Sequence, residues 1–315
     1  METYTIQNNN ITLFCTVYGA AVTSLYVKDK KGNNTNVVVG FKTVEDYKNH
    51  GYCLGASLGR YAGRIGSGYF EIDNQKFPIY TDENGVHLHG GRNGFHKRVW
   101  EVETQTETSI TFKIESEDGD EGYPGNLVAR VTYALEGNKV KNIYTATSDA
   151  KTIINLTNHN YYNLNGEGTV LNHELFINSD TFLEVTDTQI ATGKLLDVTN
   201  TPFDFRTPKI IKEQEGFTGV DDCFPIKSEE AATLYSPKTG IEMKVTTNQP
   251  GVVIFTPEDL GECNYKDDAE YSNYSSICFE TQNFPNAPHI ESFPSAILEA
   301  GKEYKNESTF EFSVR

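Results

Sequence analysis

One imidazole, His159, lies in a run of polar and aromatic side chains at residues 155–164. The run contains amides, a hydroxyl and two phenols, and each of these groups needs a hydrogen-bond partner if it is buried. The β-branched residues 152–154 directly before it indicate a strand. The pattern predicts a strand that leads into a polar, aromatic pocket wall with one titratable group. Such a wall suits a sugar better than a lipid or a nucleic acid.

A carboxylate, Glu280, stands between the strand-like residues 277–279 and the proline-bearing segment 283–288. A glutamate directly after an apolar run is usually the end of a strand that reaches solvent. Beside Gln282 and Asn283 it could equally be a positioned general base. The residues alone leave both interpretations open.

Two histidines, His87 and His89, alternate in a glycine-rich stretch, so in a strand both side chains would point to the same face. Two metal ligands could be arranged in this way, but no third ligand stands at a matching spacing. The single tryptophan nearby, Trp100, is expected in the core.

Two further charged pairs could contact a ligand. Arg60 and Arg64 lie four residues apart among glycines, where a guanidinium could hold a ligand oxygen or simply form a salt bridge at a turn. Asp221 and Asp222 are adjacent carboxylates flanked by apolar residues. A carboxylate accepts hydrogen bonds from sugar hydroxyls, although an adjacent pair on a loop is more often solvated or binds calcium weakly.

Strands must position these side chains. Apolar residues recur with period two at 110–114, 127–133, 241–245 and 309–314, and glycine- and asparagine-rich turns separate such runs. Only residues 43–49 are typical of a helix, with Thr43 as its N-cap. Neither a repeat nor a low-complexity linker interrupts the chain. The sequence predicts one all-β domain over residues 1–315, a large antiparallel β-sandwich.

Composition and net charge argue against several classes of binding partner. The net charge is −17, from 44 acidic and 27 basic residues, which argues against nucleic acid, anionic membranes and polyphosphates. The mean hydropathy of −0.50 and the short apolar runs argue against a membrane span. The five cysteines are widely spread and the N-terminus lacks a signal-peptide pattern. We therefore expect reduced thiols in a cytoplasmic protein.

Five stretches together resemble the aldose 1-epimerase (galactose mutarotase) family, in the order in which that family has them. They are GRYAGRI at 59–65, HLHGG at 87–91 with GFHKRVW at 94–100, NLTNHNYYNLNG at 155–166, the turn at Asp221, and ETQNFPNAPH at 280–289. The resemblance implies a large β-sandwich and a cofactor-independent isomerase, with no metal, that acts on free aldoses such as galactose and glucose. The oligomeric state, monomer or homodimer, stays open.

The resemblance also implies roles for individual residues. Glu280 aligns with the general base of the family and His159 with its general acid. The substrate-binding positions are Gly63, Arg64, His89, Tyr161 and Asp221. Three departures put substrate preference in doubt but leave the acid–base pair intact: Gly63 in place of a frequent asparagine, Asp222 in place of a histidine, and Thr256-Pro257 in place of Gly-Asn.

Anomer interconversion needs a proton taken from the C1 hydroxyl and another delivered to the ring oxygen. A carboxylate and an imidazole can supply this pair. From the ordinary pKa values we expect Glu280 to be ionised at neutral pH, and nearby carboxylates to raise the pKa of His159 so that it can act as the acid.

Three alternatives remain. One is a glucose-6-phosphate epimerase whose phosphate would be held by Arg92, Lys97 and Arg98. A second is a non-catalytic sugar-binding module on the same fold, against which the retention of both His159 and Glu280 argues.

The third alternative is a metal site built on His87, His89 and the pair Asp221 and Asp222. Activity that survives a strong chelator would exclude it.

Overall fold

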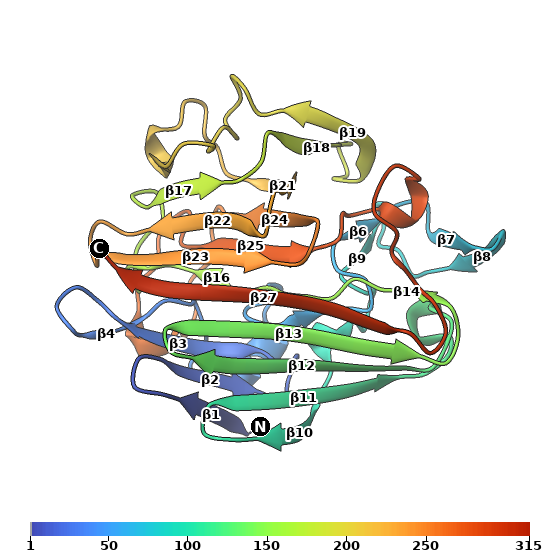
Figure 1. Cartoon of the computed structure of the whole chain (residues 1–315), viewed down its shortest axis with the longest axis horizontal. Helices are drawn as coiled ribbons and strands as arrows, with labels where there is room; N and C mark the ends of the chain where they lie inside the picture. The colour runs from blue at the N-terminus through green and yellow to red at the C-terminus, as the bar shows by residue number, and fades with distance from the viewer. Residues whose placement is uncertain (1) are drawn as a thin grey trace.

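The computed structural model describes residues 2–315, and its largest element is a nine-stranded antiparallel sheet (Figure 1). Its strands are, in spatial order, β10 (Glu101–Gln105), β11 (Ser109–Ser116), β12 (Leu127–Glu136), β13 (Lys139–Ser148), β27 (Glu303–Val314), β23 (Ile241–Thr247), β22 (Glu230–Tyr235), β17 (Glu174–Ile177) and β20 (Lys209–Ile210). The C-terminal strand β27 lies in the middle of this sheet, so the sheet joins segments from both halves of the chain.

Alternation along the long strands shows why they form. In β12 and β13 buried residues alternate with partly exposed ones, because successive side chains of a strand point to opposite faces. The two strands are joined by a two-residue turn in which Gly137 adopts a φ of +62°. The buried side chains of both strands belong to the main hydrophobic core, together with Phe310 and Phe312 of β27.

Two four-stranded antiparallel sheets accompany the large one. The first has the order β1 (Thr3–Gln7), β2 (Thr12–Thr16), β3 (Val22–Lys28) and β4 (Asn34–Asn36). The second has the order β16 (Tyr161–Tyr162), β25 (Ile277–Gln282), β24 (Gly251–Phe255) and β21 (Asp221–Pro225). We call the second one the floor sheet, because one of its faces forms the floor of the cavity described below.

Short two-stranded pairs complete the fold. They are β5 (Ser57–Leu58) with β15 (Thr157–Asn158), β6 (Arg64–Ile65) with β9 (His87–Leu88), β7 (Tyr69–Ile72) with β8 (Gln75–Pro78), β14 (Thr152–Ile153) with β26 (Ile297–Leu298), and β18 (Thr181–Val185) with β19 (Ala191–Asp197). The α-helix α1 covers Val44–Asn49, with Thr43 as its N-cap and a capping box to Asp46. Short 3-10 turns include η1 (Phe95–Lys97).

The predicted all-β sandwich is confirmed. The four alternating segments lie in β11, β12, β23 and β27, and the predicted helix is α1 with the expected N-cap. Trp100 is in the core, where it is 2% exposed and donates its Nε1–H to the Phe95 carbonyl. Within residues 2–315, helices long and apolar enough to cross a membrane are absent.

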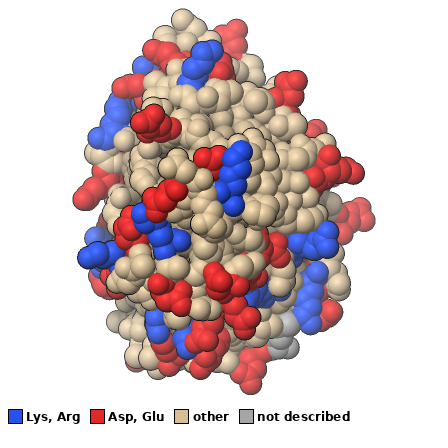
Figure 2. All heavy atoms as spheres, turned by 90° about the vertical axis from the view of Figure 1, so that its right-hand side faces the viewer, with Lys and Arg blue, Asp and Glu red and all other residues tan. Residues whose placement is uncertain are grey.

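Acidic side chains are spread over the surface. On the face shown in Figure 2, Asp and Glu side chains are interspersed with Lys and Arg over the whole outline. Ion pairs such as Arg130 with Glu103 and Lys151 with Asp73 link several of them. On this face the acidic side chains are therefore dispersed among basic ones.

Candidate active site

The floor sheet presents two chemically different faces. In the pairing of β25 with β24, Glu280 lies directly opposite Val253, and in the pairing of β24 with β21, Val253 lies directly opposite Cys223. Directly opposite residues of antiparallel strands project to the same side. Alternation then puts Phe255, Asp221 and Gln282 on that side as well.

This face lines a cavity of about 650 Å³. The loop that carries Tyr52, the segment from Leu88 to Lys97, and the hairpin β18–β19 form its walls. A cavity of this size holds a small ligand. The predicted site residues among its lining are Gly63, Arg64, His89, His159, Tyr161, Asp221 and Glu280. The fold therefore brings together all seven residues that the sequence analysis named.

Glu280 lies inside a central strand of the floor sheet and is 3% exposed. The interpretation of Glu280 as a strand end that reaches solvent is therefore wrong. The apolar run before it continues as a strand through Gln282. Only the pairing of β25 with β24 and β16 on its two sides shows that this strand is central.

Glu280 and His159 form the chemical centre of the cavity. The Nε2 atom of His159 lies 3.3 Å from Oε1 of Glu280, and both side chains are almost completely buried. His159 belongs to the segment between β15 and β16, and all ten residues of the run at 155–164 are buried. A carboxyl group and an imidazole in contact can exchange a proton and can each pass one to a bound ligand.

Burial shifts both of their pKa values. Desolvation, with a smaller contribution from Asp221, raises the pKa of Glu280 to about 8, while Arg64 acts in the opposite direction. Desolvation, with a smaller contribution from Arg64, lowers the pKa of His159 to about 4. Near neutral pH the empty pair therefore holds one proton, and that proton is on the carboxyl group.

This protonation differs from the sequence-based expectation. An ionised Glu280 and a His159 with a raised pKa were expected from the ordinary pKa values and from nearby carboxylates. The expectation is wrong because desolvation disfavours both charged forms and is the largest cause of each shift. The sequence does not show how deeply either side chain is buried.

Tyr161 holds the His159 ring from one side. The two rings are stacked, with centroids 4.8 Å apart and an interplanar angle of 20°. Phe255 meets both rings edge to face, at 6.0 Å from His159 and 6.1 Å from Tyr161. The imidazole is thus fixed by aromatic contacts, and its Nδ1 has no hydrogen-bond partner among residues 2–315.

Gly63 and His89 are joined by two hydrogen bonds. The His89 backbone N–H donates to the Gly63 carbonyl at 3.0 Å, and the Gly63 N–H donates to Nδ1 of the His89 ring at 3.2 Å. Burial, followed by His159 and His96, lowers the pKa of His89 well below its ordinary value. A neutral ring that accepts at Nδ1 carries its hydrogen on Nε2, so His89 is a hydrogen-bond donor at that atom.

Arg64 and Asp221 form an ion pair in the cavity wall. The Arg64 Nη2 lies 3.2 Å from Oδ2 of Asp221, and both side chains are about one third exposed. This exposure leaves donors of the guanidinium and the second carboxylate oxygen directed at the cavity. The neighbouring Asp222 also lines the cavity, and burial raises its pKa to about 6.

The two alternating histidines do not share a face, so that prediction is wrong. Strand β9 ends at Leu88, and His89 adopts a φ of +51° that turns its side chain out of the strand pattern. His87 has both ring nitrogens engaged at 2.6 Å, Nδ1 with the Tyr80 carbonyl and Nε2 with the Tyr123 hydroxyl. Among residues 2–315, no cluster of three or more His, Cys, Asp or Glu side chains is arranged to hold a metal. The proposed metal site therefore lacks its histidine pair.

The cluster suggested for a phosphate is divided. Arg98 pairs with Asp120 at 2.6 Å and donates to the Glu115 carbonyl, away from the cavity. Arg92 and Lys97 do line the cavity; Arg92 stacks over Tyr80 at 4.5 Å, and Lys97 donates to the Arg92 carbonyl. Two of the three cations thus remain at the site.

Among the polar residues of the lining that the sequence analysis did not assign to the site are His96 and Gln282. His96 lies in η1, and burial lowers its pKa to about 3. Gln282 lies two residues after Glu280 on β25, so its side chain shares the cavity face. The spacing from Glu280 was a usable signal for Gln282, and His96 stands inside the GFHKRVW stretch at 94–100.

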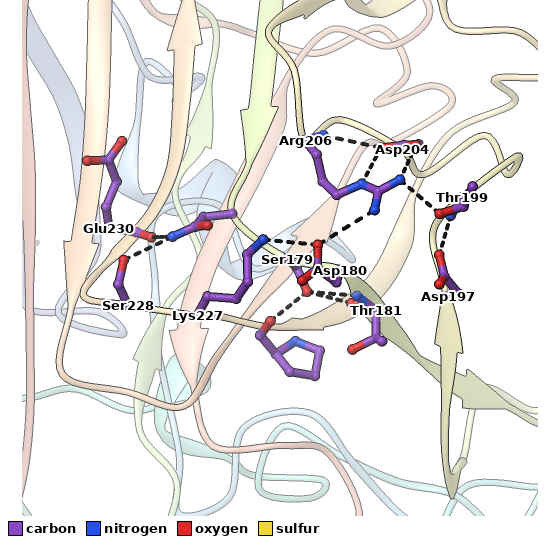
Figure 3. A network of polar contacts seen from close by, with 12 residues as sticks. Ser179, Asp180, Thr181, Asp197, Thr199, Asp204, Arg206, Lys227, Ser228 and Glu230 are labelled. Atoms are coloured by element: carbon purple, nitrogen blue, oxygen red, sulfur yellow. Dashed lines mark hydrogen bonds and ion pairs between the residues drawn. The ribbon is translucent and has the colours of Figure 1, made fainter.

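The hairpin β18–β19 contributes a wall through Leu183, Val185 and Gln189. Its base is tied to the rest of the fold by the polar network in Figure 3. Arg206, which makes two hydrogen bonds to Asp204, lies 3.6 Å from Asp180, directly before β18, and Lys227, two residues after β21, lies 2.9 Å from the same carboxylate. These contacts hold the hairpin base next to β21.

The fold and the site together define a class. It is a β-sandwich with a cavity whose floor carries a carboxyl–imidazole pair suited to general acid–base catalysis on a small polar molecule. Comparison with known proteins identifies the family within this class. The family model described as aldose 1-epimerase matches residues 2–311. The chain therefore belongs to the aldose 1-epimerase family.

Individual relatives agree over the full length. The galactose mutarotase of Pongo abelii is 36% identical over 324 residues, which cover 100% of this chain and 94% of that protein. The aldose 1-epimerase of Escherichia coli K12 is 31% identical, covering 96% and 93%.

Solved structures show the same fold. The GalM/aldose epimerase homologue from C. elegans superposes with a TM-score of 0.94 at 31% identity, covering 99% of both chains. The galactose 1-epimerase from Lactobacillus acidophilus gives a TM-score of 0.85 at 26% identity, covering 98% of this chain and 93% of that one.

Proposed function

We propose that this protein interconverts the α and β anomers of free aldohexoses such as galactose and glucose, with Glu280 and His159 moving the protons. The observation that carries the proposal is their buried contact of 3.3 Å on the floor of a sugar-sized cavity. Membership of the aldose 1-epimerase family supports the reaction type.

The reaction begins with the one proton that Glu280 and His159 hold between them. When a sugar is bound, that proton passes from Oε1 of Glu280 to Nε2 of His159, which leaves a carboxylate at the C1 hydroxyl and an imidazolium at the ring oxygen. The Arg64 charge lowers the pKa of Glu280, which favours the carboxylate, and it also lowers the pKa of His159, which opposes the imidazolium.

Ring opening then follows, and the protons shared by the pair and the sugar are conserved. Glu280 takes the C1 hydroxyl proton, His159 gives its proton to the ring oxygen, and the bond between C1 and that oxygen breaks to leave an aldehyde. Rotation about C1–C2 presents the other face of the carbonyl. The reverse transfers close the ring as the other anomer, and the pair regains its starting protons.

The neighbouring side chains hold the sugar during these steps. His89 donates from Nε2, and Arg64 and Asp221 offer a donor and an acceptor side by side. Tyr161 keeps the imidazole in place by stacking. Such positioning and charge stabilisation contribute to the rate in addition to the proton transfers.

The test is anomer interconversion followed by polarimetry in two variants. Glu280→Gln and His159→Asn should each lower kcat by about 10²–10⁴-fold, which is the usual contribution of one general acid or base. Sugar binding by His159→Asn should be largely retained. Wild-type turnover in Glu280→Gln would disprove the base, and wild-type turnover in His159→Asn would disprove the acid.

A phosphorylated sugar is the second candidate, because Arg92 and Lys97 line the cavity. Comparison of glucose and glucose 6-phosphate as substrates of the wild-type protein separates the two. We expect the free sugar to be preferred, since the third cation of the suggested cluster is paired with Asp120.

We also propose that the whole chain, residues 1–315, acts as one cytoplasmic domain. All five cysteines are free thiols, which fits a reducing compartment. Buried residues from Ile6 near the start of the chain to Phe312 near its end share the main hydrophobic core, which fits a single folding unit.

A further inference from the structure

Gln282 carries an amide that the protein itself does not satisfy. The residue is 0% exposed, yet neither its Oε1 nor its Nε2 finds a hydrogen-bond partner among residues 2–315. A buried amide without partners costs about 1–3 kcal/mol. Such a cost at a cavity wall is typical of a group that is satisfied by a ligand.

The position of Gln282 points to the part of the ligand that it would meet. Gln282 follows Glu280 by two residues on β25, so both side chains face the cavity. Two residues of an antiparallel strand span about 7 Å. That spacing is close to the width of a pyranose ring, so a sugar with C1 at Glu280 directs its opposite side, which carries the C3 and C4 hydroxyls, at Gln282.

Gly63 adjoins the amide on the cavity side and places no side chain over it. A Cβ built at Gly63 would lie 3.2 Å from Nε2 of Gln282 and 3.3 Å from Pro285. On the neighbouring strand, the residue directly opposite Gln282 is Gly251, which has no side chain either. Gly63 thus borders the amide where a side chain would otherwise cover it, whereas the ring of Phe284 fills the place of a Cβ at Gly251.

We propose that Gln282 is a substrate-binding residue that recognises the C3 and C4 hydroxyls of the sugar, and that Gly63 keeps it open to them. An amide offers a donor and an acceptor together, which matches two neighbouring hydroxyls. The C4 hydroxyl differs in orientation between glucose and galactose, so Gln282 becomes a determinant of aldose preference. This inference rests on the proposed mutarotation, because that reaction places C1 at Glu280.

The first test uses Gln282→Met, which keeps the length of the side chain but removes the amide. We expect KM for glucose and galactose to rise roughly 10-fold or more, with kcat within about threefold of wild type, because the lost hydrogen bonds hold the sugar but take no part in proton transfer. With 4-deoxyglucose as substrate, the variant and the wild type should differ much less. Unchanged KM values, or a fall in kcat alone, would overturn the proposal.

The second test adds a methyl group in front of the amide. Gly63→Ala should raise KM in the same direction, while kcat stays near wild type. Gly85→Ala is the matched control, since Gly85 has a similar φ of +74° against +79° but no atom within 4 Å of its added Cβ. Equal KM values for the two alanine variants would contradict the role of Gly63.

These outcomes separate the inference from the proposed function. If wild-type protein fails to interconvert anomers, the proposed function is wrong. If the wild type is active and Gln282→Met has the same KM, only the role of Gln282 is wrong. Thermal unfolding of each variant shows that the folded protein is being compared, and Gln282→Asn, which retains a shorter amide, should fall between wild type and Gln282→Met.

Discussion

The six residues of strand β25 alternate between two faces, one directed at the cavity and one packed into the hydrophobic core. On the cavity face, Glu280 has a strongly shifted pKa and Gln282 has an amide without partners among residues 2–315. On the core face, Ile277 and Phe279 pack into the main hydrophobic core, and the Thr281 hydroxyl lies 2.6 Å from that of Ser308.

The hydrogen bonds behind the core face are numerous. The Thr281 carbonyl accepts from Thr157 at 2.9 Å and from Asn306 at 2.8 Å. Asn155, at the start of the polar run, donates from Nδ2 to the Ala62 carbonyl and accepts at Oδ1 from the Asn283 backbone N–H. The Thr281 groups on this side are buried and hydrogen-bonded, whereas the Gln282 amide on the cavity side is buried and has no partner among residues 2–315.

The difference shows what each face contributes. A satisfied, packed face stabilises the fold, while a face with desolvated and unpaired groups costs stability and is retained for function. Substitutions on the two faces should therefore have separable effects, on stability from the core side and on activity from the cavity side. Three predictions test this separation.

The largest expected effect on stability comes from Phe279→Ala. The side chain is 2% exposed in the main core, and its removal should lower the free energy of unfolding by about 3–5 kcal/mol. Since the cavity face is not changed, kcat of the folded variant at low temperature should remain within a few-fold of wild type. Denaturant unfolding and polarimetry measure the two quantities. A loss of kcat without a loss of stability would contradict the separate roles of the two faces.

A smaller effect should follow from Glu280→Gln as a function of pH. Burial raises the pKa of Glu280 from 4.5 to about 8, so between these values the folded state holds a proton that the unfolded chain releases. Stability from this group is present below about pH 4.5 and is lost as pH rises towards 8. Between pH 6.5 and 8 the wild type should lose about 1–2 kcal/mol that Glu280→Gln does not lose.

The window from pH 6.5 to 8 isolates this group. In the folded protein the pKa values of the buried His159, His96 and His173 are all lowered, so these rings change protonation below that range. In the unfolded chain histidines titrate near pH 6.5, but this contribution is the same in wild type and variant and cancels in their difference. Denaturant unfolding at the two pH values gives the comparison. Parallel loss in wild type and variant would show that Glu280 is already ionised in the folded protein.

The smallest effect is expected from Thr281→Val. The substitution keeps the shape and removes one hydroxyl, which should cost about 1 kcal/mol of unfolding free energy. Ser308 keeps its contacts with Thr247 at 2.8 Å and Asn306 at 3.1 Å. KM and kcat should not change, although Thr281 is the direct neighbour of Glu280. A clear change in either constant would show that the two faces are coupled.

Local patterns were sufficient for much of the fold. Period-two alternation identified strands of the large sheet such as β12 and β23, and the capping residue Thr43 identified α1. These features depend on neighbours in the chain, so the sequence contains them.

The errors share one cause. Glu280 was ambiguous because a strand end and a strand centre look alike until the partner strands are known. His87 and His89 were assigned to one face because a single positive φ at His89 is not visible in the pattern. The protonation of the pair was misjudged because desolvation is a property of all the surrounding elements.

The sequence by itself determined the residue types available for catalysis, the strand-rich fold and, through five motifs, the family. The tertiary structure decided which side chains meet and in what state of charge. It joined residues 121 positions apart in the 3.3 Å contact of His159 with Glu280 and removed both from water. Both outcomes arise from the pairing of distant strands, which fixes the register and the burial of each side chain and which local patterns do not specify.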